Sequence, residues 1–445
     1  MEDTTPLEEL LGEYFAGQLS GPASLSDMER VARASLLEIG QRAFEQWLKG
    51  AVVEERVKQV GCACGGQAHY VRQRAATLRT VFGEVSYWRA YYLCPACGQG
   101  RYPLDDRLGL RPNAMSGELE RLAGMMGVER PFGQGSRLFE EMTLLSLSDQ
   151  SLDKAAQAYG QEQMQREEEW AAEAGDLDQQ LEHRRTAQPR RRLYGAMDGG
   201  RVHVRGEDGV QDALWRELKV GAWFTTRAQP PTRPDGEWSI RAENIHYYAD
   251  ICEAEVFSQL VWSTGFQHHA QLVEELIILG DGARWIWDLV DEHYPHAIQI
   301  VDWFHACEYL EPVAKVAFRQ ETHRQTWVAQ TRTALWQGRL DEVIAACQQH
   351  VDPHRADDPA QQAVTYYSNN RHRMNYPAYR ANGYHIGSGT IESGVKQIGT
   401  QRMKVAGAIW NLDPARKVAK ARAAYLSDQW NQLAARRTHL RRAAA

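Results

Sequence analysis

The chain has 445 residues, a hydrophobic share of 43% and a formal net charge of −7. That length suggests about three domains of roughly 150 residues each, and the composition is ordinary for a globular protein. No apolar run approaches the roughly 20 residues that a membrane-spanning helix needs. The acidic, polar first residues do not have the pattern of a secretory signal, so we expect a cytoplasmic protein with no membrane partner.

The charge is unevenly distributed along the chain. Residues 1–60 carry 6 Lys/Arg and 11 Asp/Glu, whereas residues 371–445 carry 14 Lys/Arg and 3 Asp/Glu, a surplus of +11. A basic tail on an acidic protein is compatible with a phosphate-facing patch. It is equally compatible with a solvated, Arg-rich amphipathic helix, and the charge alone does not decide between the two.

Residues 1–60 are expected to be helical, because apolar residues recur there with a period of about 3.6. Such a helix is compatible with an arm for DNA or a second protomer, and also with plain packing. Two tight cysteine pairs follow within residues 61–110, in the segments CAC at 62–64 and CPAC at 94–97. The stretch between them has the pattern of a β-hairpin that turns near Gly83 and Glu84.

Tight thiolate pairs flanked by glycine are typical of the two knuckles of a tetrahedral zinc site. We therefore predict a zinc ribbon with a structural Zn²⁺, since four thiolates leave no open position for catalysis. Its expected ligands are Cys62, Cys64, Cys94 and Cys97. Because the first pair is Cys-x-Cys, His69 is an alternative ligand. A redox disulfide is a further alternative, which a reducing cytoplasm disfavours. The other three cysteines are expected to be buried thiols: Cys252, Cys307 and Cys347.

Residues 111–160 show short helical segments joined by tight turns. This pattern is compatible with helix-turn-helix DNA binding, although small helical bundles have many other uses. A turn is expected at residues 148–152, before a short helix at 153–159. Residues 161–192 are dense in charge and are expected to form a solvated helix and linker, with a domain boundary at Pro189.

From residue 193 onward the pattern changes to alternating strands and helices. Short strands are expected at 193–197 and 201–205, followed by a strand at 217–225 and two buried strands at 276–280 and 297–301. Three early strands followed by alternating strand and helix predict an RNase H-like mixed sheet. The expected fold class is thus α/β, with a catalytic domain at residues 193–445 and a helical insertion at about 310–380.

Acidic residues follow several of these strands. Asp198 and Asp281 each stand at the end of a hydrophobic run and before glycine, Asp302 ends another run, and Glu392 opens a helix-like run rich in Lys and Arg. Taken singly, Asp-Gly is an ordinary turn signal and a helix-opening Glu complements the helix dipole. Brought together, such carboxylates can hold divalent cations beside a phosphodiester, and the joint pattern favours that interpretation.

The motifs around these acids resemble the ISKra-type family of bacterial insertion-sequence transposases. The matching segments are MDGG at 197–200, GDGARWIW at 280–287, VDWFHA at 301–306 and GSGTIES at 387–393, with Lys396, Arg402, Lys404, Gly407 and Trp410 behind them. The resemblance covers roughly residues 60–445, including the cysteine pairs. It implies a DDE transposase with a core related to RNase H and an acidic triad of Asp198, Asp281 and Glu392.

In such a transposase the triad would bind two Mg²⁺ (or Mn²⁺) ions. Water would first release a 3′-OH at the element end, and that 3′-OH would then attack target DNA. Asp302 and His305 are expected beside the triad, where Asp302 orients a water, pairs with His305 or caps a helix.

Three cations on the expected helical continuation after Glu392 are predicted to contact DNA phosphates: Lys396, Arg402 and Lys404. A solvated helix face is the alternative. Trp410 is expected to pack in the core rather than to stack on a base.

The resemblance implies double-stranded DNA as the partner, both as terminal inverted repeats and as target. Two element ends must be held together, so we expect a homo-oligomer, at least a dimer on DNA, in the bacterial cytoplasm and associated with the nucleoid when bound. The alternatives are an RNase H-like nuclease or resolvase without transposition, a domesticated and catalytically silent DNA-binding protein, and a zinc-ribbon RNA-binding protein.

Overall fold

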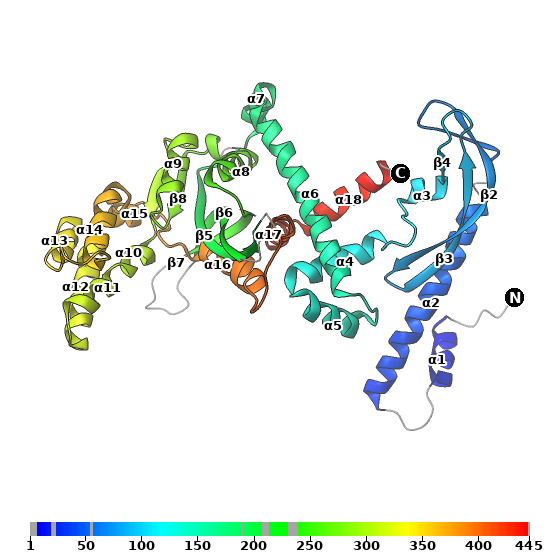
Figure 1. Cartoon of the computed structure of the whole chain (residues 1–445), viewed down its shortest axis with the longest axis horizontal. Coiled ribbons are helices and arrows are strands. Elements are labelled where there is room, and N and C mark those ends of the chain that lie inside the picture. The colour runs from blue at the N-terminus through cyan, green and yellow to red at the C-terminus, as the bar shows by residue number, and fades with distance from the viewer. Residues whose placement is uncertain are drawn as a thin grey trace. The chain divides into compact units, whose positions relative to one another are not determined.

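The computed structural model describes residues 7–18, 24–53, 57–188, 190–206, 213–229 and 239–443. The chain divides into two units, residues 1–159 with 430–445, and residues 160–429 (Figure 1). The division falls inside one long helix, α6 (Asp149–Gly175), and just before the last helix, α18 (Trp430–Ala443). The last helix therefore groups with the first unit and not with the expected catalytic domain.

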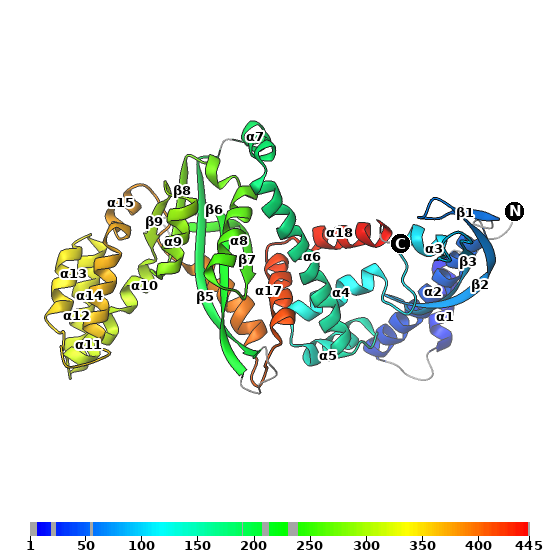
Figure 2. The ribbon, with the colours of Figure 1, turned by 45° about the horizontal axis from the view of Figure 1, so that its top comes forward.

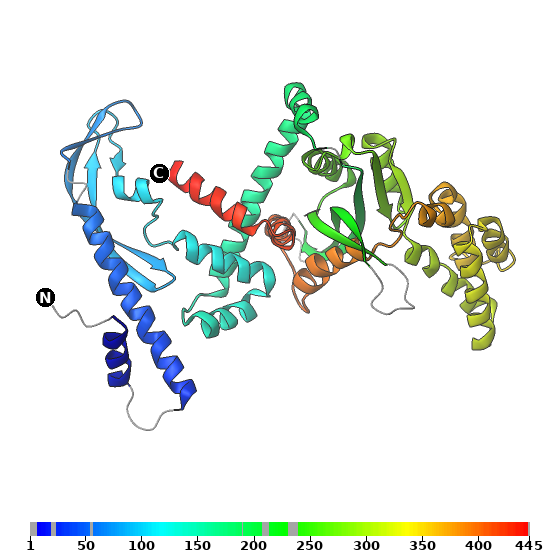
Figure 3. The same ribbon diagram turned by 180° about the vertical axis from the view of Figure 1, so that it is seen from behind.

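The first unit opens with two helices, α1 (Leu7–Gln18) and α2 (Leu25–Val53). An antiparallel sheet follows, which in the described part of the chain consists of β1 (Gln59–Gly61), β2 (Gln67–Thr80), β3 (Gly83–Leu93) and β4 (Gly100–Arg101). The hairpin turns at Gly83, whose φ of 110° favours glycine, which confirms the predicted turn. The helix α2 lies along β3 (Figure 3), where Leu48 packs with Val85 and Tyr87.

Short helices continue the first unit: α3 (Pro103–Leu108), α4 (Gly117–Glu129) and α5 (Phe132–Thr143). Ser116 caps α4, because its side chain accepts a hydrogen bond from the amide of Leu119 at 3.2 Å. The turn expected at 148–152 is instead largely the first turn of α6, and the short helix expected at 153–159 runs on to residue 175. Burial explains the difference, since apolar side chains remain buried as far along α6 as Trp170 and Ala174.

The charge-dense segment is helical, as expected, and consists of the rest of α6 and of α7 (Leu177–Thr186). The α7 part has no buried residue, which agrees with the predicted solvated helix, whereas the α6 part is partly buried. Glu167 on α6 is only 8% exposed, and the ammonium group of Lys420 donates to it at 2.5 Å and to Asp250 at 2.9 Å. Buried charges persist only when paired, so these ion pairs hold α6 beside α17 (Leu412–Leu426) and β7 (Ser239–Asp250). Pro189 lies outside the described residues.

A mixed sheet forms the centre of the second unit (Figure 2). Its described strands have the order β7-β6-β5-β8-β9, with β5 (Arg192–Arg205), β6 (Ala213–Gln229), β8 (Glu275–Gly280) and β9 (Ile298–Val301). Neighbours are antiparallel from β7 to β5 and parallel from β5 to β9. The two strands expected around Asp198 are one continuous strand, in which Asp198 pairs with Val220 and Gly200 with Leu218. The Asp-Gly pair is therefore not a turn here.

Helices cover both faces of this sheet. On one face, the indole of Trp223 donates to Thr264 of α8 (Ala254–Gln267) at 3.0 Å, and α9 (Arg284–His293) lies beside it. On the other face, the hydroxyl of Tyr247 donates to the carbonyl of Thr390 in α16 (Gly389–Val395) at 3.1 Å, and the π-helix η3 (Lys396–Met403) follows. Side chains alternate along a strand, so Asp198 and Gly200 share the α16 face, where Gly200 lies close to Val395.

Between β9 and α16 the chain is largely helical. The helices are α10 (Trp303–Glu308), α11 (Leu310–Ala317), α12 (Glu321–Trp336), α13 (Leu340–Gln348), α14 (Pro359–Asn369) and α15 (Tyr376–Ala381), with a short 3-10 turn η2 (Arg371–Arg373). A further 3-10 turn, η1 (Ala270–Leu272), precedes β8. Within the described ranges, none of the helices combines the length and the apolar character that a membrane crossing requires.

Candidate functional site

Three aspartates stand level with one another at one edge of the mixed sheet. In the β5–β8 pairing, the last partners are Ala196 and Leu279, which lie two positions before Asp198 and Asp281, respectively. The last paired residues of β8 and β9 lie one position before Asp281 and Asp302. Because adjacent strands are about 4.8 Å apart, the register brings the backbones of the three acids into neighbouring positions.

Backbone amides hold the first two carboxylates. Asp198 accepts a hydrogen bond from the amide of Gly199 at 2.6 Å, and Asp281 accepts one from the amide of Ala283 at 2.7 Å. The hydroxyl of Tyr366 on α14 donates to the backbone carbonyl of Asp281 at 2.8 Å. The turn after Asp281 thus has a support from the helical segment as well as from its own backbone.

Asp302 connects the end of β9 to the start of α16. It is fully buried, and one oxygen accepts from the amide of His305 at 2.7 Å, which caps α10. Its other oxygen accepts from the amide of Ser388, whose hydroxyl donates to Glu392. Ligand atoms of Asp302, His305 and Glu392 all lie within 4.8 Å of one another, so these three residues could hold a metal ion. The helix-cap role considered for Asp302 is confirmed, and the same residue also joins Glu392.

Burial and like charges act together on Asp198. Its pKa is raised to about 6. Burial is the largest cause, and the charges of Asp281 and Glu392 add to the rise, whereas the Gly199 amide and His305 oppose it. Asp198 and Asp281 lie outside the 4.8 Å group, but the acids are within electrostatic reach of one another. In the part of the chain that the structure describes, no Lys or Arg forms a salt bridge with any of these carboxylates. A cluster of uncompensated carboxylates suits hard divalent cations.

The three predicted DNA-binding cations differ in their surroundings. Lys396 and Lys404 are exposed, whereas Arg402 is only 1% exposed and its guanidinium lies 5.2 Å from the ring centroid of Trp410. The expectation that Arg402 reaches the surface is therefore wrong. The segment after Val395 is a π-helix, so spacings that place side chains on one face of an α-helix do not apply. Trp410 packs against the core, as expected.

Two residues of this region were not predicted. Ser388 lies in the Gly-Ser-Gly segment before Glu392. A hydroxyl four residues ahead of an acid is only a weak indication in the sequence that the two side chains form a hydrogen bond. Tyr366 is 85 residues from Asp281 in the chain, and no local pattern indicates such a contact.

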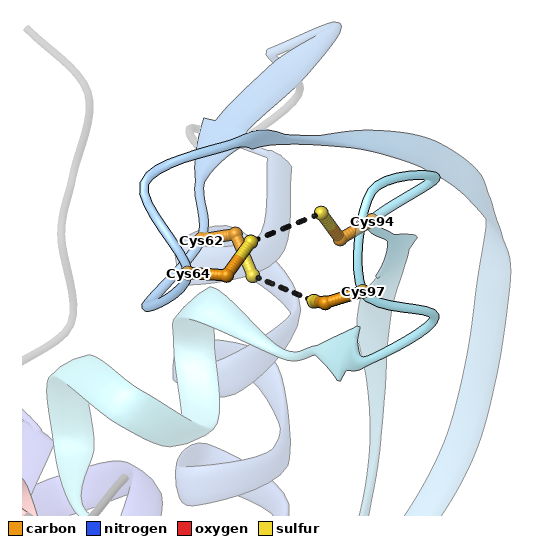
Figure 4. Close-up of side chains that lie close together, drawn as sticks. All are labelled: Cys62, Cys64, Cys94 and Cys97. Atoms are coloured by element: carbon orange, nitrogen blue, oxygen red, sulfur yellow. Dashed lines mark hydrogen bonds between the residues drawn. The ribbon is translucent and has the colours of Figure 1, made fainter.

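The four paired cysteines converge in the first unit (Figure 4). The sulfur of Cys62 lies 3.5 Å from that of Cys97, and the sulfur of Cys64 lies 3.7 Å from that of Cys94. A tetrahedral zinc ion with Zn–S bonds of about 2.3 Å separates its sulfurs by about 3.8 Å. All four sulfurs lie within 4.8 Å of one another, so the group could hold a metal such as zinc.

The alternatives to a four-thiolate site do not fit. His69 is exposed, its ring nitrogen contacts the side-chain amide of Gln59 at 3.3 Å, and it is not part of the cysteine group. All four cysteines are free thiols rather than disulfides. The predicted ligand set therefore comes together without a histidine.

Backbone amides prepare the second knuckle for an anionic sulfur. The amide of Cys97, and then that of Ala96, donate toward Cys94 and lower its pKa to about 7. Gly65 and Gly98 have φ values of 84° and 71°, in the left-handed region that glycine adopts without strain. The glycines that flanked each pair in the sequence are thus needed for the tight turns.

No protein-family model matches this chain, and no curated protein matches it.

Proposed function

We propose that the protein is an insertion-sequence DNA transposase of the DDE type, related to the ISKra-type family, with an RNase H-like catalytic core. The observation that carries the proposal is the level arrangement of Asp198, Asp281 and Asp302 across β5, β8 and β9, with Glu392 linked to it through Ser388. Four carboxylates from separate elements in one place are difficult to explain by packing, because like charges repel.

The strand order supports an RNase H-like core. In that fold the first acid lies on the first strand, the second follows the fourth strand, and the third lies on a helix that packs beside both. In the second unit Asp198 is on the first strand, β5, Asp281 follows the fourth, β8, and Glu392 is on α16, which packs against β5 and β6. The helices α11 to α15 occupy the place of an insertion before the last acid.

In this proposal Asp198, Asp281 and Glu392 are the catalytic acids, and they would hold Mg²⁺ or Mn²⁺. When bound, such ions stabilise the charge that develops on the scissile phosphate. Asp302 positions Glu392 through Ser388, and His305 lies against both acids. Gly199 and Gly282 beside the acids make room for neighbouring side chains, because a Cβ at Gly199 would meet the carboxylate of Glu217 and one at Gly282 would meet the ring of Tyr366.

The reaction consists of two in-line displacements at phosphorus. In the first, water attacks and the bond from phosphorus to the 3′ oxygen breaks, which releases a 3′-OH at the element end. In the second, that 3′-OH attacks a target phosphodiester, a new phosphorus–oxygen bond forms, and the bond from phosphorus to the target's own 3′ oxygen breaks, which leaves a 3′-OH on the target strand. Neither step forms a covalent bond between protein and DNA, so no Ser or Tyr nucleophile is required.

The first unit supplies the proposed end recognition. A zinc-bound cysteine group would stabilise the β2–β3 hairpin, and the helices α4 to α6 are candidates for contact with the terminal inverted repeats. Lys396 and Lys404, both exposed, remain candidates for phosphate contact near Glu392. We further propose a dimer or larger assembly on DNA, in the cytoplasm.

The test is to incubate the full-length protein with Mg²⁺ or Mn²⁺ and a plasmid that carries the DNA flanking its gene. Every new 3′ end is then mapped by sequencing, for the wild type, for Asp198→Asn and for the control Asp178→Asn. Asp178 is an exposed acid on α7 away from the four carboxylates. We expect cuts at defined flanking positions, lost by at least about a hundredfold in Asp198→Asn because removal of an essential metal ligand abolishes the charge stabilisation, and retained in the control.

Other outcomes identify the alternatives. Scattered cuts that disappear in Asp198→Asn indicate a nuclease without end recognition. Binding to the flanking DNA without any metal-dependent cut indicates a catalytically silent DNA-binding protein, and cuts that persist in Asp198→Asn contradict the assignment of this acid.

A further inference from the structure

A cavity of about 750 Å³ lies between α9 and α14 of the second unit. Gly282 lines one end of it, so it begins directly beside Asp281. Tyr366 lines it as well and donates to the carbonyl of Asp281. The volume is within the range of about 300–1,000 Å³ that is typical of small-molecule sites.

Aromatic rings line the cavity from both helices. Tyr309 and Tyr366 stack with their ring centroids 3.8 Å apart and an interplanar angle of 16°. Trp287 on α9 carries the guanidinium of Arg373 at 4.6 Å from its ring centroid. Trp287 and Tyr366 are buried, so the half-buried ring of Tyr309 is the one on which a planar ligand would stack.

Side-chain amides line the same cavity. Gln362 and Asn369 are seven residues apart on α14 and therefore lie on one face of it, with Tyr366 between them. Both amides are exposed, and neither forms a side-chain hydrogen bond with another described residue. Each amide offers a donor and an acceptor together, which is the pairing that the edge of a nucleobase presents.

The charges of the lining cancel. Arg284 and Arg373 face Asp288 and Asp291, and Arg284 lies 3.4 Å from the carboxylate of Asp288. A run of phosphates requires a surplus of cations, and a divalent cation requires converging carboxylates. A formally neutral site of aromatic rings and amides therefore favours an uncharged heterocycle over either of these ligands.

One buried donor in the lining lacks a partner. The side chain of Trp287 is only 4% exposed, and its buried indole N–H has no acceptor among the described residues. Buried polar groups are nearly always hydrogen-bonded in native proteins. Because the nitrogen itself is buried, a carbonyl or ring nitrogen of a ligand would accept from it only after the side chains around it shift.

We propose that this cavity binds a single unpaired nucleobase of the DNA strand that passes Asp281. The inference rests on the proposed function in one respect, that the ligand of the site is DNA. Tyr309, which is half-buried, would then contact the base, and Tyr366 stacks on Tyr309 and supports the second catalytic acid. A base that is already unpaired should bind more tightly than a paired one, because a paired base must first be separated from its partner, which costs free energy.

The test measures DNA binding by fluorescence anisotropy without divalent cations, so that no cleavage is needed. The probes are a short duplex with one unpaired adenine, the same duplex fully paired, and the same duplex with an abasic nucleotide in place of the adenine. The abasic probe shares the bend of the first duplex but has no base. We expect the wild type to bind the unpaired adenine at least about fivefold more tightly than the other two probes, since the amides of Gln362 and Asn369 would form hydrogen bonds with the edge of the base, and a fivefold change corresponds to about 1 kcal/mol, the typical contribution of one such bond.

The variant Gln362→Ala/Asn369→Ala should lose that preference and keep its affinity for the paired duplex. Both positions are exposed, so folding should be retained, which a thermal melt checks. Gln348→Ala, an exposed amide on α13 outside the cavity, should keep the preference.

The inference is overturned if the wild type shows no preference, if the abasic probe binds as well as the unpaired adenine, or if the double variant retains the preference. Failure to bind any of the three probes overturns it too, together with the DNA partner. An adenine preference that depends on Gln362 and Asn369, in a protein that never cleaves its flanking DNA, would support the base site and contradict the transposase activity.

Discussion

Asp302 uses both of its carboxylate oxygens in hydrogen bonds with backbone amides. One bond caps α10 through His305, and the other reaches Ser388, which in turn contacts Glu392. Burial raises the pKa of Asp302, and the two amides oppose that rise. The residue therefore orients Glu392, although it does not need to touch the substrate itself.

An Asp302→Asn substitution should separate these two roles. The amide oxygen can still cap α10, but the NH₂ group would then face the amide of Ser388, donor against donor. We expect metal-dependent cleavage of flanking DNA to fall about 10- to 100-fold, with a loss of unfolding free energy of about 1–3 kcal/mol, measured by 3′-end mapping and urea denaturation. Unchanged cleavage in Asp302→Asn, relative to Asp178→Asn, would contradict a positioning role.

The site residues that were predicted from the sequence are those that stand out from their immediate neighbours in the chain. Asp198, Asp281 and Asp302 each follow an apolar run. β8 and β9 end just before Asp281 and Asp302, and Asp198 lies level with them within β5. Ser388 and Tyr366 were missed, and Arg402 was placed wrongly. Their environments depend on segments far away in the chain, as the 85-residue separation of Tyr366 and Asp281 illustrates.

The hairpin that carries the four-cysteine group is the element whose stability would depend most directly on a bound metal. Its small apolar cluster contains Ala68, Ala90 and Tyr92 beside two of the cysteines, so a metal would contribute a large part of the cohesion of the hairpin ends. The amide donors around Cys94 favour the thiolate that a metal needs.

Cys94→Ser should remove the bound metal. We expect an equimolar zinc content in the wild type, measured by elemental analysis, and almost none in the variant, with faster amide hydrogen exchange in β2 and β3. Cys307→Ser is the matched control, because Cys307 lies outside the cysteine group. A wild-type protein purified with zinc in the medium and found free of metal would refute the site.

Two helices differ from the prediction because the spacing of polar and apolar residues in the sequence does not determine which side chains the fold buries. The charged stretch of α6 has a solvated composition, yet Glu167 is buried against Lys420, 253 residues away. The segment after α16 has the spacing of an α-helix face, yet it is a π-helix that turns Arg402 inward. In the first case a distant partner decides which side chains are buried, and in the second the π-helical geometry does.

At the scale of the whole chain, the first unit is completed by residues from the far end. Trp430 of α18 is 4% exposed and stacks on Tyr159 with ring centroids 4.2 Å apart, and Arg437 pairs with Glu120 of α4 at 2.9 Å. Gly124 of α4 leaves the room that the indole of Trp430 occupies. The chain thus leaves the first unit through α6 and returns to it through α18.

Trp430→Ala should therefore destabilise the first unit selectively. Loss of a buried indole costs about 3–5 kcal/mol, so amide hydrogen exchange in α4 should accelerate while exchange in β5 and β8 stays unchanged. Leu177→Ala, at an exposed position on α7, is the control. Equal acceleration in the β5–β8 pair would show that the two units do not unfold separately.

The sequence by itself determined the mixed strand and helix content, the hairpin turn at Gly83, the pairing of four cysteines into one possible metal site and the acids that follow apolar runs. These features depend on neighbours within a few residues, where periodicity, turn chemistry and ligand spacing act. Only the tertiary structure decided that β5 runs unbroken through Asp198, that Asp302 is joined to Glu392, that Arg402 and Glu167 are buried, and that α18 completes the first unit. Each of these outcomes depends on a contact between distant segments, and burial and charge pairing at such contacts outweigh local preference.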